Sequence, residues 1–225
     1  MMNEFVIKEI KERVIEDNDA VAADLRAELE GRNVFLVNLM ASPGAGKTTT
    51  LVRTIKALAG DYRIGVMEAD VDSAVDAQTI SETGAKVIQL HTGGSCHMDA
   101  DMTKRGLDAL DVSDLDVVFL ENVGNLVCPA EFDVGAARKV MILSCPEGHD
   151  KPLKYPLMFS ISDCLLINKM DTAQVFHFDL EQLKKNVAPI NPNIPIFPVS
   201  SLKGDGFDAW IAWLKGQIDD WKKNR

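Results

Sequence analysis

The sequence predicts an α/β protein with a doubly wound, mostly parallel β-sheet. Apolar runs that suit buried strands alternate along the chain with segments that suit amphipathic helices. Glycine-rich and acidic motifs follow several of these runs, where the carboxyl ends of parallel strands form ligand sites. With 225 residues, 46% of them hydrophobic, the chain is long enough to bury one sizeable core.

The order of the elements follows from the apolar runs and the segments between them. The predicted strands are residues 33–40, 63–69, 86–91, 116–121, 138–145, 163–168 and 195–199. The predicted helices are residues 47–59, 73–83, 99–110, 152–159, 179–188 and 205–222. Ahead of them, residues 3–30 carry apolar side chains at a helical period, and Gly31 ends this segment. We therefore expect an N-terminal helical segment, residues 1–31, packed on one domain, residues 32–225.

The composition argues against several classes of partner. A formal net charge of −10 disfavours a nonspecific nucleic-acid binder. The chain has no run of about 18 apolar residues and no signal-peptide core, so we expect no membrane partner. The four cysteines are irregularly spaced, at positions 96, 128, 145 and 164. This spacing favours reduced thiols in the cytoplasm over a disulfide framework.

A phosphate-binding loop is predicted directly after the first strand. Residues 41–48 read Ala-Ser-Pro-Gly-Ala-Gly-Lys-Thr, and a helical stretch follows. Backbone N–H groups of such a loop hold phosphate oxygens, Lys47 reaches the β- and γ-phosphates, and the Thr48 hydroxyl binds Mg²⁺. Ala41 replaces the usual first glycine, a position that needs only an ordinary φ. A chance glycine-rich turn is the alternative, and the flanking strand and helix argue against it. The predicted phosphate-binding residues are Gly44, Ala45, Gly46, Lys47, Thr48 and Thr49.

A guanine-binding motif is predicted after the strand at 163–168. Asn168-Lys169-Met-Asp171 places one carboxylate where it can accept both the N1–H and the 2-amino group of guanine. Adenine offers no such pair of donors, so Asp171 is expected to select the base and Asn168 to support the loop. A serine-rich loop after residues 195–199 partly resembles a GTPase loop that meets the guanine oxygen. Its serines are alternatively an ordinary cap of the last helix. The predicted base-site residues are Asn168, Lys169, Asp171, Ser200, Ser201 and Leu202.

Acidic residues after two other strands are predicted to hold Mg²⁺ and the attacking water. Glu121-Asn-Val-Gly124 resembles the GTPase turn in which an acid binds Mg²⁺ through water and a glycine N–H meets the γ-phosphate. Asp70, Asp72 and Asp76 follow the second strand. Asp72 is alternatively a helix cap and Asp76 a solvated side chain. The predicted catalytic residues are Lys47, Asp70, Asp76 and Gly124, and the predicted Mg²⁺ ligands are Thr48, Asp70 and Glu121.

Three further side chains form a candidate transition-metal site. Cys96 and His97 lie in a glycine-rich loop after residues 86–91, and Cys128 follows residues 116–121. Thiolate and imidazole suit Zn²⁺ and also bind Ni²⁺. Each residue alone is more often a packing residue, but the trio beside a nucleotide site favours metal binding. Three ligands leave the coordination shell incomplete, so water or a second copy must complete it. Cys145 and Cys164 are expected to be structural.

Taken together, these motifs resemble one family, HypB, whose GTPases assist nickel insertion into [NiFe]-hydrogenase. The resemblance is carried by Thr92–Ala100, Glu121–Pro129 and Glu147–Pro156, together with the phosphate loop and the Asn-Lys-x-Asp motif. Glu121–Pro129 and the Cys96-His97 pair are its most specific parts. The resemblance implies a P-loop GTPase fold of the SIMIBI-like kind, slow GTP hydrolysis to GDP, and Mg²⁺. It also implies Ni²⁺ or Zn²⁺ at the Cys-His-Cys site near a GTP-dependent homodimer interface. Other hydrogenase maturation factors and a hydrogenase large subunit are the implied partners.

The resemblance has limits, and three other functions remain open. The N-terminal segment has no cysteine and the chain has only 4 histidines, so a nickel-storage role is not expected. A urease-type GTPase metallochaperone is the nearest alternative, although such proteins resemble a Cys-Pro-His unit instead. An ATP-dependent P-loop kinase is disfavoured by Asp171, and a passive metal-binding protein is disfavoured by Lys47 and Thr48. Nucleotide preference and a GTPase assay separate these readings.

Overall fold

A computed structural model gives the protein a seven-stranded sheet in which every pair of neighbouring strands is parallel. It describes the backbone of residues 2–70 and 75–223 and the side chains of residues 14–70 and 76–223. The strand order is β3-β2-β4-β1-β5-β6-β7. The strands are β1 Phe35–Ala41, β2 Ile64–Asp70, β3 Lys86–His91, β4 Val117–Glu121, β5 Arg138–Ser144, β6 Cys164–Asn168 and β7 Ile196–Pro198. The predicted doubly wound α/β fold is confirmed.

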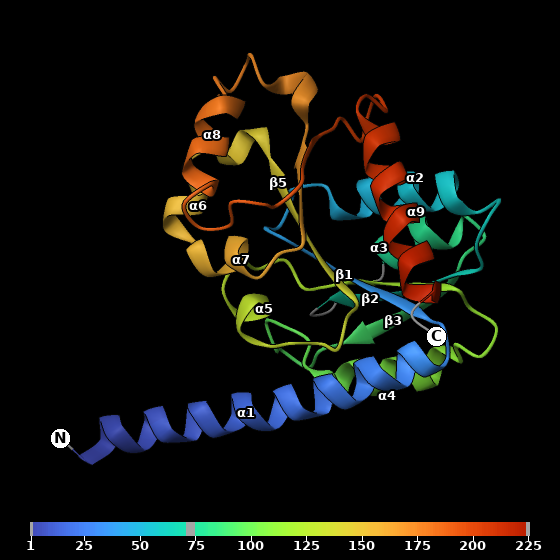
Figure 1. The fold of residues 1–225 in the computed structure, drawn as a ribbon, viewed down its shortest axis with the longest axis vertical. Helices are drawn as coiled ribbons and strands as arrows, with labels where there is room; N and C mark the ends of the chain where they lie inside the picture. Colours follow the sequence, from blue (N-terminus) through green and yellow to red (C-terminus); the bar gives the residue numbers. More distant parts are fainter. Residues whose placement is uncertain (1, 71–74, 224–225) are drawn as a thin grey trace.

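Helices cover both faces of this sheet (Figure 1). They are α1 Met2–Gly31, α2 Lys47–Leu58, α3 Val75–Ser81, α4 Ala100–Leu110, α5 Cys128–Glu131, α6 Lys151–Lys154, α7 Pro156–Ser160, α8 Leu180–Val187 and α9 Phe207–Lys223. Two 3₁₀ turns, η1 Cys145–Glu147 and η2 Met170–Thr172, lie between them. α2 and α9 pack on one face. α1 and α4 cover the other face at one end, and α7 and α8 cover it at the other end.

The core explains why the strands are apolar at nearly every position. In β1, Phe35 and Val37 point to the face under α2 and α9, whereas Leu36 points to the face under α1 and α4. All three side chains are fully buried. A strand buried on both faces needs apolar residues at successive positions, and helices on both faces bury them. Most polar residues of the site therefore lie near the carboxyl ends of the strands or in the loops that follow them.

Several predicted boundaries differ from the structure for local reasons. The helix predicted over 152–159 is divided into α6 and α7, because Tyr155 precedes Pro156 and residues before proline disfavour the helical conformation. Cys145 begins a 3₁₀ turn instead of ending β5. The short helix α5 was not predicted. The first two residues of the helix predicted over 73–83 lie outside the described residues.

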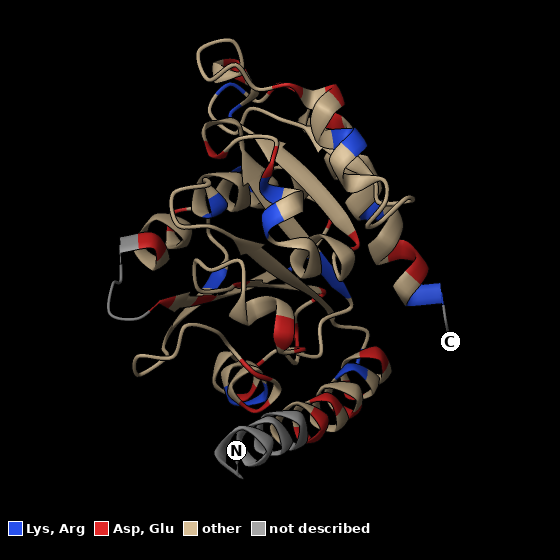
Figure 2. Cartoon of the chain, turned by 90° about the vertical axis from the view of Figure 1, so that its left-hand side faces the viewer, with Lys and Arg blue, Asp and Glu red and all other residues tan. Residues whose placement is uncertain are grey.

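α1 lies along α4, and both helices cover the same part of the sheet (Figure 1). Leu25 and Leu29 of α1 are buried in the core that this helix shares with α4. The charged residues in the described part of α1 are mostly acidic, and Figure 2 shows them as red bands among fewer blue ones. The division into a helical segment and a separate domain stays a prediction. Among the described residues, no helix has both the length and the apolar composition needed to cross a bilayer.

The backbone beneath α1 leaves no room for a side chain at Gly135. This residue has a φ of +75°, and a Cβ there would lie 3.0 Å from the carbonyl oxygen of Ala22 and 3.0 Å from a Leu25 methyl group. We predict that Gly135→Ala lowers the free energy of unfolding by about 1–3 kcal/mol, because the new methyl group strains the backbone and pushes against α1. Urea unfolding of the purified variant measures the change.

Gly216 supplies the matched control for this substitution. It lies inside α9, and a Cβ there would meet nothing within 4 Å. Gly216→Ala should therefore stabilise the protein by about 0.5–1 kcal/mol through lower backbone entropy. If Gly135→Ala were as stable as Gly216→Ala, the close packing of this segment under α1 would be wrong.

Candidate nucleotide and metal site

The predicted phosphate loop connects β1 to α2 at the carboxyl edge of the sheet. Ala41 ends β1 and is fully buried, so alanine fits where the motif usually has glycine. Gly44 and Gly46 have positive φ values of 74° and 96°, which the loop needs in order to turn into α2. A Cβ on Gly46 would lie 2.5 Å from Nδ2 of Asn168. The loop therefore rests directly on the predicted guanine-binding motif.

Asn168 joins the phosphate loop to the serine-rich loop. Its Nδ2 donates to the carbonyl oxygen of Ala45 at 3.0 Å and faces Thr50 Oγ1 at 3.4 Å. Its Oδ1 accepts from the Ser201 N–H at 3.0 Å, the Ser201 hydroxyl at 2.8 Å and the Lys169 N–H at 2.8 Å. The side chain is buried and both of its polar atoms are used. Asn168 therefore links the two loops and supports both of them.

Lys169 contacts the phosphate loop, and Asp171 contacts the serine-rich loop. Lys169 has a left-handed φ of 60°, and its Nζ donates to the Gly44 carbonyl oxygen at 2.7 Å. Asp171 Oδ1 accepts from the Ser200 hydroxyl at 2.7 Å, and the Asp171 side chain is exposed to solvent. The Ser200 hydroxyl thus aims a carboxylate that has room for a ligand. The alternative of a helix cap at Ser200 or Ser201 is wrong, because α9 begins at Phe207.

Sequence reasoning missed Arg53, which supports the same loop from α2. Its Nε donates to the Ser201 carbonyl oxygen at 2.8 Å, and its Nη2 donates to the Leu202 carbonyl oxygen at 3.1 Å. The guanidinium also lies 5.5 Å from the centre of the Phe207 ring. Leu202 itself is 76% exposed at the tip of the loop, and Thr49 is exposed beside it. No local motif signals Arg53, because its partners lie 148 and 149 residues away.

All four predicted catalytic residues line one cavity of about 330 Å³. A Cβ on Gly124 would lie 3.0 Å from Pro43 of the phosphate loop, so the turn after β4 contacts that loop. Asp72 lies outside the described residues. Glu68, which was not predicted, also lines the cavity. The predicted catalytic residues and the two glutamates that line the cavity are Lys47, Asp70, Asp76, Gly124, Glu121 and Glu68.

Two buried glutamates face each other across β2 and β4 in this cavity. Glu68 and Glu121 are directly paired in the strand register, and each is 2% exposed. The Thr48 hydroxyl donates to Oε1 of Glu121 at 2.8 Å. Burial raises the pKa of Glu121 to about 7, although Lys47 and Thr48 lower it. Burial and the charge of Glu121 raise the pKa of Glu68 to about 8.

The donor set of this cavity fits a divalent cation. Among the described side chains, Oε2 of Glu68 and Oε2 of Glu121 are buried without a hydrogen-bond partner. Mg²⁺ prefers carboxylate, hydroxyl and phosphate oxygens, and it would neutralise the repulsion between the two carboxylates. Asp70 and Glu121 line this cavity, and Thr48 is joined to it by the hydrogen bond of its hydroxyl to Glu121.

Cys96, His97 and Cys128 converge from two loops. Their ligand atoms all lie within 4.8 Å of one another, and the two Sγ atoms are 2.9 Å apart. Gly93 and Gly94 have positive φ values of 63° and 93°, which turn the loop so that adjacent residues face one point. Burial lowers the pKa of His97, which favours the neutral imidazole that binds metals. The hydrogen bond from Cys96, together with burial, raises the pKa of Cys128.

Sequence reasoning also missed the side chain that links the cavity to the metal loop. Asn122 follows β4 directly and is fully buried. Its Oδ1 accepts from the Val123 N–H at 2.9 Å and from the Met98 N–H at 3.2 Å. Its Nδ2 donates to Oδ1 of Asn38 in β1 at 3.1 Å. One carboxamide thus connects the turn that carries Gly124 to the residue after His97.

Comparisons with known proteins agree with this arrangement. Residues 35–198 match the family described as CobW/HypB/UreG, nucleotide-binding domain. The chain is 44% identical over 209 residues to the hydrogenase maturation factor HypB of Azotobacter chroococcum, covering 93% of this chain and 68% of the relative. The structure of HypB from Helicobacter pylori in complex with nickel has a TM-score of 0.85 at 33% identity, covering 93% of this chain and 99% of that one. HypB from Archaeoglobus fulgidus has a TM-score of 0.84 at 35% identity, covering 90% and 99%.

The fold and the phosphate loop define a nucleotide-binding P-loop protein. Within that class, the chain belongs to the HypB family of hydrogenase maturation factors. The resemblance drawn from the sequence motifs is confirmed.

The raised pKa of Glu68 has a consequence for stability. Between pH 4.5 and about 8 the folded protein keeps Glu68 protonated while the unfolded chain ionises it, so its contribution to stability falls as the pH rises. We predict that Glu68→Gln removes this loss. Between pH 5 and pH 8, the metal-free variant should gain at least about 1.4 kcal/mol over the parent protein, the equivalent of one pKa unit.

Urea unfolding at both pH values, in the presence of a chelator, measures this gain. Glu82→Gln is the matched control, because it makes the same substitution at an exposed position outside the cavity. Identical pH dependence in the parent protein and in Glu68→Gln would contradict the raised pKa.

Proposed function

We propose that this protein is a GTP-hydrolysing nickel metallochaperone that assists nickel insertion during the maturation of [NiFe]-hydrogenase. The observation that carries the proposal is the convergence of Cys96, His97 and Cys128 within 4.8 Å, on loops that follow two strands of the nucleotide-binding sheet. Relatives named hydrogenase maturation factor HypB, one of them solved in complex with nickel, support it. The free thiols suit a cytoplasmic protein.

On the nucleotide side, each residue has a proposed task. Asp171 accepts the two guanine donors, and its contact with the Ser200 hydroxyl fixes its direction. Gly44, Ala45 and Gly46 provide backbone N–H groups for the phosphates, and Lys47 bears the positive charge that stabilises the transition state. Mg²⁺, when bound, neutralises charge on the β- and γ-phosphates. Thr48, Asp70 and Glu121 would hold it, and Asp76, which lines the same cavity, would position the attacking water.

On the metal side, the trio is proposed to bind Ni²⁺ as cargo, with Zn²⁺ as the competing ion. Two thiols and one imidazole form three-quarters of a four-coordinate shell. The site lies at the surface, because Cys96 is exposed and Cys128 is only partly buried. A fourth ligand can therefore come from water or from a second copy of the chain. A GTP-dependent homodimer is the assembly that would bring this second copy.

The two sides are proposed to be coupled through the end of β4. Gly124 contacts the phosphate loop, and Asn122 bonds both to the neighbouring Val123 N–H and to the Met98 N–H beside His97. A γ-phosphate that draws in Gly124 would move Cys128, four residues further on, relative to Cys96 and His97. Nucleotide state would thereby govern when the cargo is held or passed to other maturation factors and the hydrogenase large subunit.

The alternative functions differ from this proposal at identifiable residues. A urease-type chaperone would use the same hydrolysis for another client, and the Cys96-His97 pair favours the hydrogenase client. A P-loop kinase would bind ATP, which Asp171 disfavours because adenine has an acceptor at N1. A passive metal-binding protein would have no use for the Lys47 and Thr48 arrangement beside Glu121.

Base selection provides the test of the GTPase assignment. We predict that Asp171→Asn shifts the preference from GTP toward xanthosine triphosphate by at least about 100-fold, because the new amide can donate to the 2-oxo group of xanthine. Steady-state hydrolysis with GTP, xanthosine triphosphate and ATP measures the shift.

Lys47→Ala is the control for this experiment. It removes a phosphate contact and not a base contact, so it should lower hydrolysis of GTP by about 100-fold or more without changing the order of preference among bases. Full GTP preference in Asp171→Asn, or ATP preference in the parent protein, would contradict the proposed base site.

A further inference from the structure

Asn18 of α1 lies between the two segments that carry the metal-site residues. Its Oδ1 accepts from the Ala100 N–H at 2.9 Å, and its Nδ2 donates to the Asp133 carbonyl oxygen at 2.9 Å. Ala100 begins α4, three residues after His97, and Asp133 follows the short helix that begins at Cys128. One side chain thus spans both metal-site segments from outside the sheet.

The Oδ1 atom of Asn18 accepts a hydrogen bond from an amide at the start of α4. The Ala100 N–H is among the first amides of the helix, which have no partner within the helix itself. Ala100 is fully buried, so its amide has no access to water. Loss of Asn18 would leave this buried donor unpaired, and the loop that leads into α4 would have to shift in order to satisfy it.

The Nδ2 group of Asn18 donates to a segment that is also joined to α1 by an ion pair. Arg26 Nη2 lies 2.7 Å from Oδ2 of Asp133, and Arg26 Nε donates to the Ala136 carbonyl oxygen at 2.9 Å. Lys139 Nζ lies 3.1 Å from the same Oδ2. Burial tends to raise the pKa of Asp133, but Lys139, the Gly135 N–H and Arg26 together lower it below its ordinary value. The ion pair with Arg26 and the hydrogen bond from Asn18 therefore hold Asp133 against α1.

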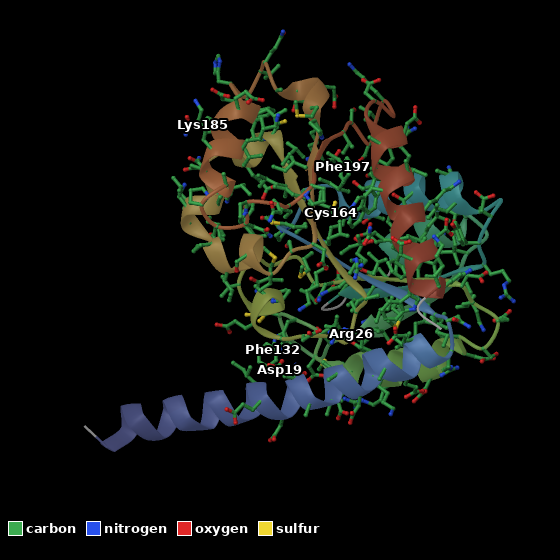
Figure 3. The ribbon with its side chains drawn as sticks, viewed as in Figure 1. Asp19, Arg26, Phe132, Cys164, Lys185 and Phe197 are labelled. Atoms are coloured by element: carbon green, nitrogen blue, oxygen red, sulfur yellow. The ribbon has the colours of Figure 1, made fainter. Side chains whose placement is uncertain are left out.

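The candidate metal ligands lie beside the segments that Asn18 and Arg26 hold. The ring of Phe132, the residue before Asp133, stacks on the His97 ring with centroids 4.0 Å apart and an angle of 22° between the planes. In the view of Figure 3, Phe132 is labelled just above the ribbon of α1. A shift of the segment at 132–133 would thus move a ring that sets the orientation of His97, as well as the end of the helix that carries Cys128.

From these contacts we infer that Asn18 is a positioning residue for the metal site: it fixes the separation between the Cys96-His97 loop and the Cys128 segment. This inference rests on the proposed metal function of the trio. It assigns α1 a task beyond packing, because the helix that covers the sheet also sets the geometry of the thiol and imidazole ligands. Loss of the two Asn18 hydrogen bonds would then change the affinity for a thiolate-preferring divalent metal.

The test is a titration of Ni²⁺ into the protein of residues 1–225. Absorbance from thiolate-to-nickel charge transfer reports the geometry of the site, and competition with a chelator gives the affinity. Asn18→Ala should weaken Ni²⁺ binding by about tenfold, in the range seen when groups that orient metal ligands are removed, and should change the charge-transfer band. The GDP affinity of the metal-free protein should be unchanged, because the two Asn18 hydrogen bonds go to Ala100 and Asp133 and not to the phosphate loop.

Leu29→Val is the matched control on the same helix. Leu29 is 2% exposed and packs in the core under α1, and its loss of a methylene loosens the docking of α1 without removing either hydrogen bond. Thermal unfolding of the metal-free proteins checks that both variants fold and compares their loss of stability.

The outcomes separate this inference from the metal function itself. Weaker Ni²⁺ binding with an altered band in Asn18→Ala, and parent-like binding in Leu29→Val, supports the inference. Parent-like binding and spectrum in Asn18→Ala would overturn it, as would equal weakening in both variants, which would reduce Asn18 to general docking of α1. No Ni²⁺ binding by the parent protein would instead overturn the proposed metal function.

Discussion

The carboxamide of Asn168 holds together the three segments from which the nucleotide site is built. It donates to Ala45 of the phosphate loop and accepts from Ser201 of the base-site loop, while its own backbone ends β6. Gly46 has no side chain, and a Cβ there would lie 2.5 Å from this amide. A buried amide with both ends satisfied fixes distances more firmly than its net energy suggests, because any displacement leaves a buried polar group unpaired. One side chain therefore holds the phosphate loop against the predicted base-site loop.

A second carboxamide, that of Asn122, extends the same logic to the metal residues. The sheet order places β4 between β1 and β2, so the segment after β4 lies between the phosphate loop and the acidic end of β2. Asn122 bonds to Asn38 in β1 on one side and to Met98, beside His97, on the other. A strand end that contacts both sites is the physical basis for proposing that they communicate. Asn18 acts on the same loops from the opposite side, through α1.

The sequence predicted the strands and the linear motifs well, because both depend on local patterns. Continuous apolar runs specify strands that are buried on both faces, and the phosphate loop and the Asn-Lys-x-Asp motif are short and ordered along the chain. The expectation that Cys96, His97 and Cys128 converge also followed from the sheet, because parallel strands end at one edge.

Other features depend on contacts that sequence spacing does not encode. Asn18 reaches residues 82 and 115 positions away, and Arg53 reaches across 148. Glu68 reads as one acid in a strand until its pairing with Glu121 reveals two buried carboxylates side by side. The break between α6 and α7 was readable from Pro156, since residues before proline disfavour helix, but the apolar pattern of residues 152–159 obscured it.

The central claim is that nucleotide state and metal affinity are linked through the end of β4. The most direct measurement is the affinity for Ni²⁺ and for Zn²⁺ of the protein bound to GDP and of the protein bound to a nonhydrolysable GTP analogue, with Cys128→Ala as the control that lacks the moving ligand. A coupling of about 1–3 kcal/mol is ordinary for such switches, so the two affinities should differ by roughly 5- to 150-fold, and the metal must change analogue affinity by the same factor. The difference should vanish in Cys128→Ala. Equal affinities in both nucleotide states, for both metals, would contradict the account.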